Sequence, residues 1–183
     1  MRRKLKLVLL ITVFALCVSC ATTGQVSPDA VMIDGVPFFS QEAYQCGPTA
    51  LAIVMDYWYA KTQSGKRVTP EQIAADIYSP SARGVLGIDL ELYAGKHGFK
   101  THQYSGSIAD LRKNVDLGIP AIIFVDYGFS IYEVNHFMVV TGYTGDSVIV
   151  NSGKRENRSI ADGELEKIWK KNRYWTLVLK PSA

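Results

Sequence analysis

The sequence predicts an α+β domain in which a buried helix packs against an antiparallel sheet. Residues 47–60 carry large apolar side chains at helical spacing, which is typical of a helix with one face in the core. Residues 136–151 contain two alternating apolar runs joined by a glycine-containing turn, a pattern typical of a β-hairpin. The apolar stripe of the helix consists of Leu51, Val54, Met55 and Trp58.

The N-terminus has the pattern of a secretory signal peptide, with the basic stretch MRRKLK followed by the apolar run LVLLITVFAL. The run is too short for a membrane span, and a polar, proline-containing segment follows it. Its end, from Leu16 to Cys20, resembles the lipobox of bacterial lipoproteins. The resemblance implies removal of residues 1–19 and lipidation of Cys20. Plain secretion, with cleavage near Ala21, is the alternative.

After this processing, residues 20–33 are expected to form a lipidated N-terminus and a short tether, followed by a single domain at 34–183. Ala21 after the lipidated cysteine is the residue that usually accompanies outer-membrane sorting in Gram-negative lipoproteins. The expected location is therefore the outer membrane, facing the periplasm, with membrane contact through the lipid. Processing removes four basic residues and leaves sixteen basic against seventeen acidic ones. This balance gives no support for a nucleic-acid partner.

Of the three cysteines in the sequence, one is expected to keep a free thiol. Cys17 leaves with the signal peptide and Cys20 carries the lipid, so Cys46 has no partner for a disulfide. A lone cysteine in an exported protein is either buried and inert or kept for its reactivity. Cys46 lies off the apolar stripe, at the start of the helix, where Pro48 fits the first turn. The helix N-terminus favours a thiolate, so the position favours a nucleophile.

A thiol nucleophile needs a base, and the chain has three histidines. His97 ends a predicted helix, where a structural role explains it. His102 lies in a short polar strand that is expected to be exposed. His136 opens the core strand HFMVVTGY and is therefore the candidate base, with a purely structural histidine as the alternative.

The predicted hairpin supplies a third polar group. Asn151 ends the strand that follows His136, so the two side chains are expected to lie together at one end of the sheet. The Asn151 amide could then accept a hydrogen bond from the imidazole and fix its tautomer. Asp146 competes for this role but lies in the turn at the opposite end of the hairpin. Asp126, at the end of the strand AIIFVD, is a second competitor.

The remaining segments are predicted to be scaffold. Thr69, Pro70 and Gln72 form the N-terminal signature of one helix, and a second helix runs from Ser107 to Gly118. A last helix near residues 160–171 precedes the strand YWTLVL. Two glycine-containing connections, residues 79–87 and 127–135, are the expected walls of a substrate groove.

The run VPFFSQEAYQCGPTALAIVMDY, followed by GVLGIDLELYAGKHGFK, DLGIPAIIFVDY, NHFMVVTGY and VIVNSG, resembles the bacteriocin-processing (double-glycine leader) peptidase superfamily. The resemblance covers residues 34–180. It implies a papain-like fold with the nucleophile on a helix and the histidine on an antiparallel sheet. It further implies Cys46 as nucleophile, His136 as general base and acid, Asn151 as orienting residue and Gln41 as oxyanion-stabilising residue.

The sequence departs from this family at two positions and in its context. Family members commonly have aspartate where this chain has Asn151. Gln41 lies five residues before Cys46, one fewer than expected, and Gln45 is a possible substitute. Leader peptidases of the family are typically cytoplasmic domains fused to export transporters, whereas this chain is expected on the other side of the membrane.

The expected function is hydrolysis of peptide bonds through a thioester, with a peptide or protein as substrate. No metal or other cofactor is expected, because one cysteine and scattered histidines do not provide the spacing of a zinc site. Two alternatives stay open. One is a peptidoglycan-directed cysteine amidase or endopeptidase, although such enzymes usually have Asp-Cys-Ser where this chain has Gln-Cys-Gly-Pro. The other is a non-catalytic peptide-binding module with the same fold.

Overall fold

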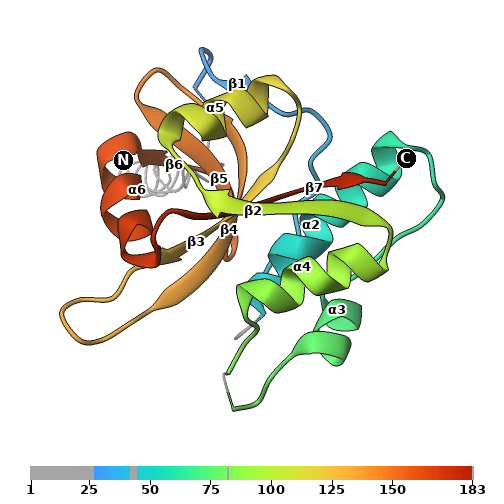
Figure 1. The fold of residues 1–183 in the computed structure, drawn as a ribbon. Coiled ribbons are helices and arrows are strands. Elements are labelled where there is room, and N and C mark those ends of the chain that lie inside the picture. The colour runs from blue at the N-terminus through green and yellow to red at the C-terminus, as the bar shows by residue number, and fades with distance from the viewer. Residues whose placement is uncertain (1–26, 42–44, 82, 183) are drawn as a thin grey trace, which may run out of the picture.

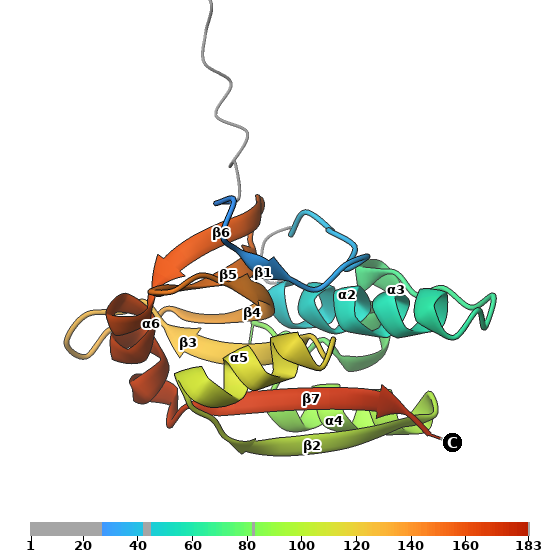
Figure 2. The ribbon, with the colours of Figure 1, turned by 90° about the horizontal axis from the view of Figure 1, so that it is seen from above.

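The computed structural model describes residues 27–41, 45–81 and 83–182. Its core is an antiparallel sheet with the strand order β2-β7-β3-β4-β5-β6 (Figures 1 and 2). The short strand β1 pairs with the last two residues of β4. The strands are β1 (Val31–Met32), β2 (Phe99–Ser105), β3 (Ala121–Asp126), β4 (Asn135–Tyr143), β5 (Ser147–Ser152), β6 (Arg155–Ala161) and β7 (Trp175–Pro181).

Two helices, α2 (Cys46–Lys61) and α4 (Gly87–Lys96), pack on the sheet, and α3 (Pro70–Ile77) packs on these two helices. The α2 helix is the predicted core helix, and twelve of its sixteen residues are buried. Its apolar side chains pack against Ile122, Phe137, Val139 and Leu177 of the sheet. Figure 1 shows α3 and α4 beside α2. These two helices pack against α2, so most of the α2 surface that faces away from the sheet is also covered. This burial explains why α2 is apolar nearly all round.

Two further helices, α5 (Ile108–Asp116) and α6 (Asp162–Trp169), pack in a second apolar cluster with side chains such as Met138, Val150 and Ile160. A short 3-10 helix, η1 (Lys170–Asn172), follows α6 and contacts β3. Successive residues of a strand face opposite sides of a sheet. Phe137 and Val139 therefore belong to the α2 cluster, and Met138 and Val140 belong to the second cluster.

Local signals in the sequence produce several of these elements as predicted. Thr69 and Gln72 form a complete capping box at the start of α3, with Pro70 in its first turn. Ser107 caps α5 by accepting a hydrogen bond from the Asp110 amide. Gly118 ends this segment with a φ of 66°, in the left-handed region that favours glycine. The α+β class and the antiparallel sheet are confirmed.

Other parts of the fold were not predicted. The β6 strand had no sequence signal, because its residues RENRSIA lack an apolar alternation. The β1 strand lies in the segment expected to be a tether, residues 20–33, and pairs with β4 through Val31 and Met32. The predicted signal peptide and Cys20 lie outside the described residues. In the described part of the chain, none of the helices has the length and apolar character needed to cross a membrane.

Candidate active site

Cys46 is the first residue of α2, which confirms the position predicted for it. Its thiol accepts hydrogen bonds from the backbone amides of Phe137 and Gly47. Pairing between β4 and β5 begins at Val139, so Phe137 lies outside that ladder. The sulfur of Cys46 is therefore held against the backbone of the residue that follows His136.

The environment of Cys46 favours the neutral thiol. Burial raises the pKa of the thiol above its ordinary value, and the Phe137 and Gly47 amides oppose this effect only in part. The sequence predicted a thiolate from the helix N-terminus alone. In the described conformation the cost of burying a charge outweighs the helix dipole and the local amides.

His136 lies near the start of β4 and is partly buried. Burial and the nearby Arg158 guanidinium lower the pKa of the imidazole to about 4. Arg158 is held by a hydrogen bond of 3.2 Å from its guanidinium to the Tyr127 hydroxyl, and the Tyr127 ring lies 6.2 Å from the His136 ring. His136 is therefore neutral at pH 7, which is the form that a general base requires.

Among the residues that the structure describes, the hydrogen-bond partner of the imidazole is Ser152, at the end of β5. The distance from His136 Nε2 to Ser152 Oγ is 3.0 Å, and Ser152 is buried. A hydroxyl can donate to Nε2 or accept from it, whereas a carboxylate can only accept. Ser152 therefore positions the ring without fixing its tautomer and adds no negative charge to stabilise an imidazolium. The sequence prediction did not include Ser152.

The hydrogen bond expected between His136 and Asn151 is not formed. The buried Asn151 Oδ1 accepts from the backbone amide of Asn157 at 3.0 Å, and Nδ2 donates to the Pro37 carbonyl at 3.4 Å. Asn157 lies at an irregularity of β6 with a φ of 49°, so its amide has no regular partner in the β5–β6 ladder. Asn151 thus satisfies a backbone amide that a bulge leaves free.

The expected hydrogen bond is absent because Asn151 and His136 lie on opposite faces of the sheet. Asn151 pairs with Val139, which belongs to the α2 cluster. His136 and Met138 lie on the opposite face, where Ser152 reaches the imidazole. Among the described residues no hydrogen bond joins His136 to Cys46.

The two competing aspartates have structural roles. Asp146 accepts hydrogen bonds from the Thr144 and Ser147 hydroxyls at 3.0 and 2.9 Å, which fits the predicted turn chemistry. Asp126 Oδ1 accepts from the amides of Gly128 and Val134 at 2.6 and 2.7 Å. Asp126 thus closes the connection between β3 and β4.

This connection, residues 127–134, projects beyond the sheet in both views (Figures 1 and 2). Tyr127 N donates to the Val134 carbonyl at 3.0 Å, and Phe129 pairs with Tyr132 in an isolated bridge. The side chains of Phe129, Ile131 and Tyr132 are exposed by 87%, 84% and 75%. The connection is therefore a closed, apolar-tipped loop that leads directly to His136, and its predicted role as a groove wall stays a prediction.

Gln41 is buried, and its backbone amide donates to the Gly153 carbonyl at 3.0 Å. This bond brings Gln41 next to Ser152, at the end of β5. Gln45 precedes Cys46 as the N-cap residue of α2, and its side chain makes no capping hydrogen bond. Residues 42–44 between them lie outside the described part of the chain.

The other predicted groove wall also reaches the start of α2. A methyl group added to Gly47 would lie 2.2 Å from Val85 and 3.3 Å from the Phe137 ring. The connection that carries Val85 and the strand that carries His136 therefore meet on the backbone of Gly47. Only a residue without a side chain permits this approach beside Cys46.

A cysteine that begins a buried helix, packed on an antiparallel sheet with a histidine near the start of one strand, is typical of the papain-like class of cysteine peptidase folds. The chain matches the Peptidase_C39 like family over residues 33–176, and it belongs to that family. No curated protein matches the sequence.

Solved structures confirm the fold. A structure described as a C39-like peptidase from Bacillus anthracis is 19% identical, covering 84% of this chain and 99% of its own, with a TM-score of 0.66. A double glycine motif protease from an AMS/PCAT transporter, in complex with the leader peptide, is 24% identical, with coverages of 86% and 97% and a TM-score of 0.63. The peptidase domain of Streptococcus ComA, a bi-functional ABC transporter involved in quorum sensing, is 18% identical, with coverages of 80% and 99% and a TM-score of 0.62.

Proposed function

We propose that this chain is a cysteine peptidase in which Cys46 attacks a peptide carbonyl and His136 transfers the protons. The observation that carries the proposal is the position of the Cys46 thiol, at the start of α2 and hydrogen-bonded to the amide of Phe137. This amide belongs to the residue after His136, so the nucleophile and the base come from adjacent backbone. Membership of a peptidase-like family supports the same reaction class.

The reaction starts from a neutral pair. His136 takes the proton from Cys46 as the sulfur bonds to the carbonyl carbon, and the carbonyl electrons move to the oxygen. The protonated imidazole then donates to the departing amine, the C–N bond breaks, and a thioester remains on Cys46. Water, deprotonated by His136, releases the acyl group and restores the thiol. Gln41 and the amide of Cys46 are the proposed donors to the oxyanion.

Substrate binding is proposed to complete this arrangement. The raised pKa of Cys46 and the lowered pKa of His136 both oppose proton transfer in the free protein. Catalytic hydrogen bonds are often long or absent in free enzymes and shorten in the substrate complex. The loop of residues 127–134 leads to His136, and its exposed apolar tip is the proposed contact for the substrate.

The proposed substrate is a peptide or protein at the cell envelope. The peptide nature is supported by the related double glycine motif protease, whose structure contains a leader peptide. We further propose that the chain is a lipoprotein anchored through Cys20, in the outer membrane and facing the periplasm. Incorporation of labelled palmitate should be lost in Cys20→Ala and retained in Cys17→Ala. Equal labelling of both variants would contradict the anchor.

A peptide library and purified peptidoglycan, each incubated with the wild type, Cys46→Ala and His136→Gln, test the activity. Mass spectrometry should find new peptide termini with the wild type alone, and no released muropeptides. Cleavage that persists in Cys46→Ala would refute the proposed nucleophile. Release of muropeptides by the wild type alone would instead favour the peptidoglycan-directed amidase.

A second function, peptide binding without turnover, is favoured by one observation. No hydrogen bond joins Cys46 to His136 among the described residues, and the partner of the imidazole is a hydroxyl instead of a carboxylate. Under this alternative, a peptide would bind the wild type and Cys46→Ala with equal affinity, and neither protein would cleave it.

A further inference from the structure

An arginine lies beside the histidine of the proposed active site. Arg158 of β6 pairs with Val150 of β5, and Val150 belongs to the second apolar cluster. Paired residues of an antiparallel sheet project from the same face, so Arg158 shares the face of His136 and Ser152. The arginine is therefore on the side of the sheet where the imidazole is held.

Tyr127 connects the two side chains. The Arg158 guanidinium donates to the Tyr127 hydroxyl at 3.2 Å and lies 5.8 Å from the centre of the Tyr127 ring. The same ring lies 6.2 Å from the His136 ring. Burial and, as a second cause, the charge of Arg158 lower the pKa of the imidazole to about 4. Arg158 therefore belongs to the surroundings of the proposed base.

The guanidinium has no carboxylate partner in the described part of the chain, where none of the ion pairs includes it. Asp126, next to Tyr127 in the sequence, is already paired with Lys171 at 3.9 Å. Arg158 is partly buried, and its hydrogen bond to the Tyr127 hydroxyl uses one of five N–H donors. A partly buried cation without a counter-ion is costly, and a planar guanidinium matches the two oxygens of a carboxylate. This position therefore favours a carboxylate as its ligand.

The proposed reaction brings a second positive charge to this position. His136 becomes an imidazolium when it takes the proton of Cys46, and the charge of Arg158 opposes this step. Ser152, the described partner of the ring, is a hydroxyl and supplies no negative charge. A carboxylate bound to Arg158 would balance the guanidinium and attract the imidazolium. The described side chains thus lack an anion that a substrate can bring.

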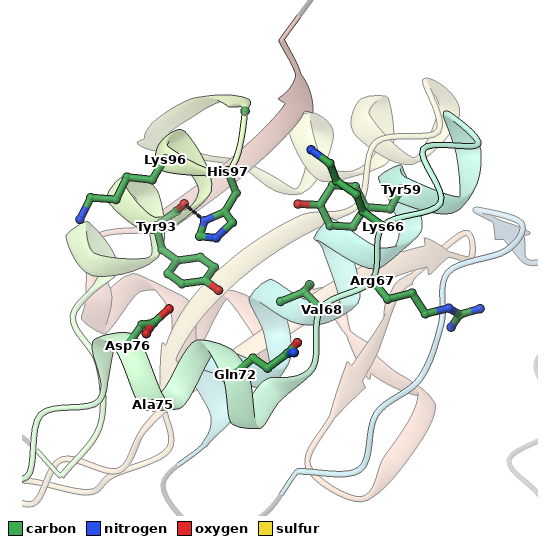
Figure 3. Close-up of a pocket in the computed structure, with 11 residues that line it drawn as sticks. Tyr59, Lys66, Arg67, Val68, Gln72, Ala75, Asp76, Tyr93, Lys96 and His97 are labelled. Carbon is green, nitrogen blue, oxygen red and sulfur yellow. Dashed lines mark hydrogen bonds between the residues drawn. The ribbon is translucent and has the colours of Figure 1, made fainter.

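A cavity of about 890 Å³ between α2, α3 and α4 is a less suitable place for such a carboxylate (Figure 3). Tyr59 in its wall is thirteen residues after Cys46, which corresponds to about 20 Å along the helix axis. Of the basic side chains there, Arg67 is already in an ion pair of 3.6 Å, and Figure 3 shows Lys96 directed away from the space. A carboxylate in this cavity would also be far from the proposed nucleophile.

We propose that Arg158 binds a carboxylate of the peptide substrate close to the scissile bond, and that this carboxylate supplies the negative charge that the site lacks. It belongs to an acidic side chain of the substrate or to its free C-terminus, because both present the same two oxygens to a guanidinium. The inference rests on the proposed peptidase activity and names the class of peptide on which it acts. Arg158 is then a residue that determines specificity.

Four sets of peptides test this specificity and distinguish the two sources of the carboxylate. The sets are libraries with glutamate or glutamine at a position that is scanned along the peptide, each with a free or an amidated C-terminus. Mass spectrometry measures how fast the wild type cleaves each set at low concentration, where the rate is proportional to kcat/KM. One form of carboxylate should increase this rate at least about tenfold over its amide. Equal rates for all four sets would overturn the proposal.

Variants of the arginine locate the contact. In Arg158→Gln the ratio of the rates for acidic and neutral peptides should fall to about one, and Arg158→Lys should keep part of the preference. Arg67→Gln is the matched control, because the Arg67 side chain is 86% exposed at the distant cavity, and it should keep the full preference. Circular dichroism establishes that each variant is folded. A full preference in Arg158→Gln, or an equal loss in Arg67→Gln, would contradict the assignment.

A measurement without turnover separates this inference from the proposed activity. NMR titration of the His136 ring is carried out in Cys46→Ala, with short blocked alanine peptides that contain one glutamate, one glutamine or a free C-terminus. A peptide with a carboxylate should raise the pKa of His136 above about 4, and the glutamine peptide should not. The difference between the peptides should disappear when Arg158→Gln is added.

The two assays have distinguishable failures. If the wild type cleaves none of the peptides but a carboxylate raises the pKa of His136, the proposed activity fails and the carboxylate site stands. If acidic and neutral peptides are cleaved equally and neither changes the pKa, the activity stands and the role of Arg158 is overturned. No effect of a carboxylate in either assay overturns the inference whether or not peptides are cleaved.

Discussion

The hydroxyl of Ser152, which contacts the His136 imidazole, can be replaced by a carboxylate. Ser152→Asp places a carboxylate where the structure has a hydroxyl 3.0 Å from His136 Nε2. A carboxylate accepts from Nε2, fixes the proton there, and stabilises the protonated ring. We expect the pKa of His136 to rise well above its value of about 4 in the wild type.

The magnitude follows from the Coulomb energy. A unit charge about 4 Å from the imidazolium contributes about 4 kcal/mol at an effective dielectric constant of about 20, or about three pKa units. Burial of the new carboxylate and its attraction to Arg158 oppose part of this gain. A net rise of about two units is therefore expected, which brings the pKa of His136 to about 6.

NMR titration of the His136 ring measures this pKa directly, with the resonance assigned by its loss in His136→Gln. Ser159→Asp, which adds a carboxylate at an exposed position of β6, should shift the pKa far less. If the peptidase proposal is correct, Ser152→Asp should also increase the rate of peptide cleavage, and Ser152→Ala should decrease it. An unchanged pKa in a folded Ser152→Asp protein would refute the assigned contact.

Four further outcomes are expected. Asn151→Ala should lower the free energy of unfolding by about 1–3 kcal/mol, measured in urea, because a buried backbone amide loses its acceptor, while the pKa of His136 stays within NMR error. Gly47→Ala should destabilise the fold by about 1–3 kcal/mol in the same assay, because the methyl group meets Val85 at 2.2 Å. Between pH 6.5 and about 4 the unfolded chain protonates His136 and the folded chain does not, so stability should fall on acidification by up to about 3 kcal/mol, and His136→Gln should lose this part of the pH dependence. Alkylation of Cys46 by iodoacetamide, followed by mass spectrometry, should be slower than that of a free thiol at neutral pH and should keep rising through pH 9.

Much of the fold could be predicted because its signals are local. The stripe of α2, the capping box of α3 and the apolar runs of β3, β4 and β5 each lie within a few consecutive residues. The β6 strand could not be predicted, since its pairing with β5 depends on position in the sheet and not on its own composition.

The residue that contacts the His136 imidazole is Ser152 and not the predicted Asn151, and a β-bulge explains this difference of one residue. Tyr143 pairs with Val148 near the turn, and an unbulged hairpin would place Asn151 on the face of His136. The extra residue Thr141 shifts the register between Val140 and Gly142 and moves Asn151 to the other face. Ser152 then occupies the position beside the imidazole. Gly142, an isolated glycine within the strand run, is the local signal for this bulge, and the sequence prediction did not use it.

The protonation state of Cys46 shows a similar limit. Its place at a helix N-terminus could be predicted from the Gly-Pro pair that follows it. The degree of burial, which raises the pKa of the thiol, depends on the packing of β4 and of the connection that carries Val85. These segments are distant in sequence, so the net effect required the three-dimensional structure.

The central claim is that Cys46 forms a covalent intermediate with its substrate. Intact-protein mass spectrometry after acid quenching of the wild type with a peptide library measures this directly. The account predicts an added mass on Cys46 that hydroxylamine removes, that is absent in Cys46→Ala, and that accumulates more slowly in His136→Gln. A folded wild-type protein that releases peptide products without any adduct on Cys46, or that carries the same adduct in Cys46→Ala, would contradict it.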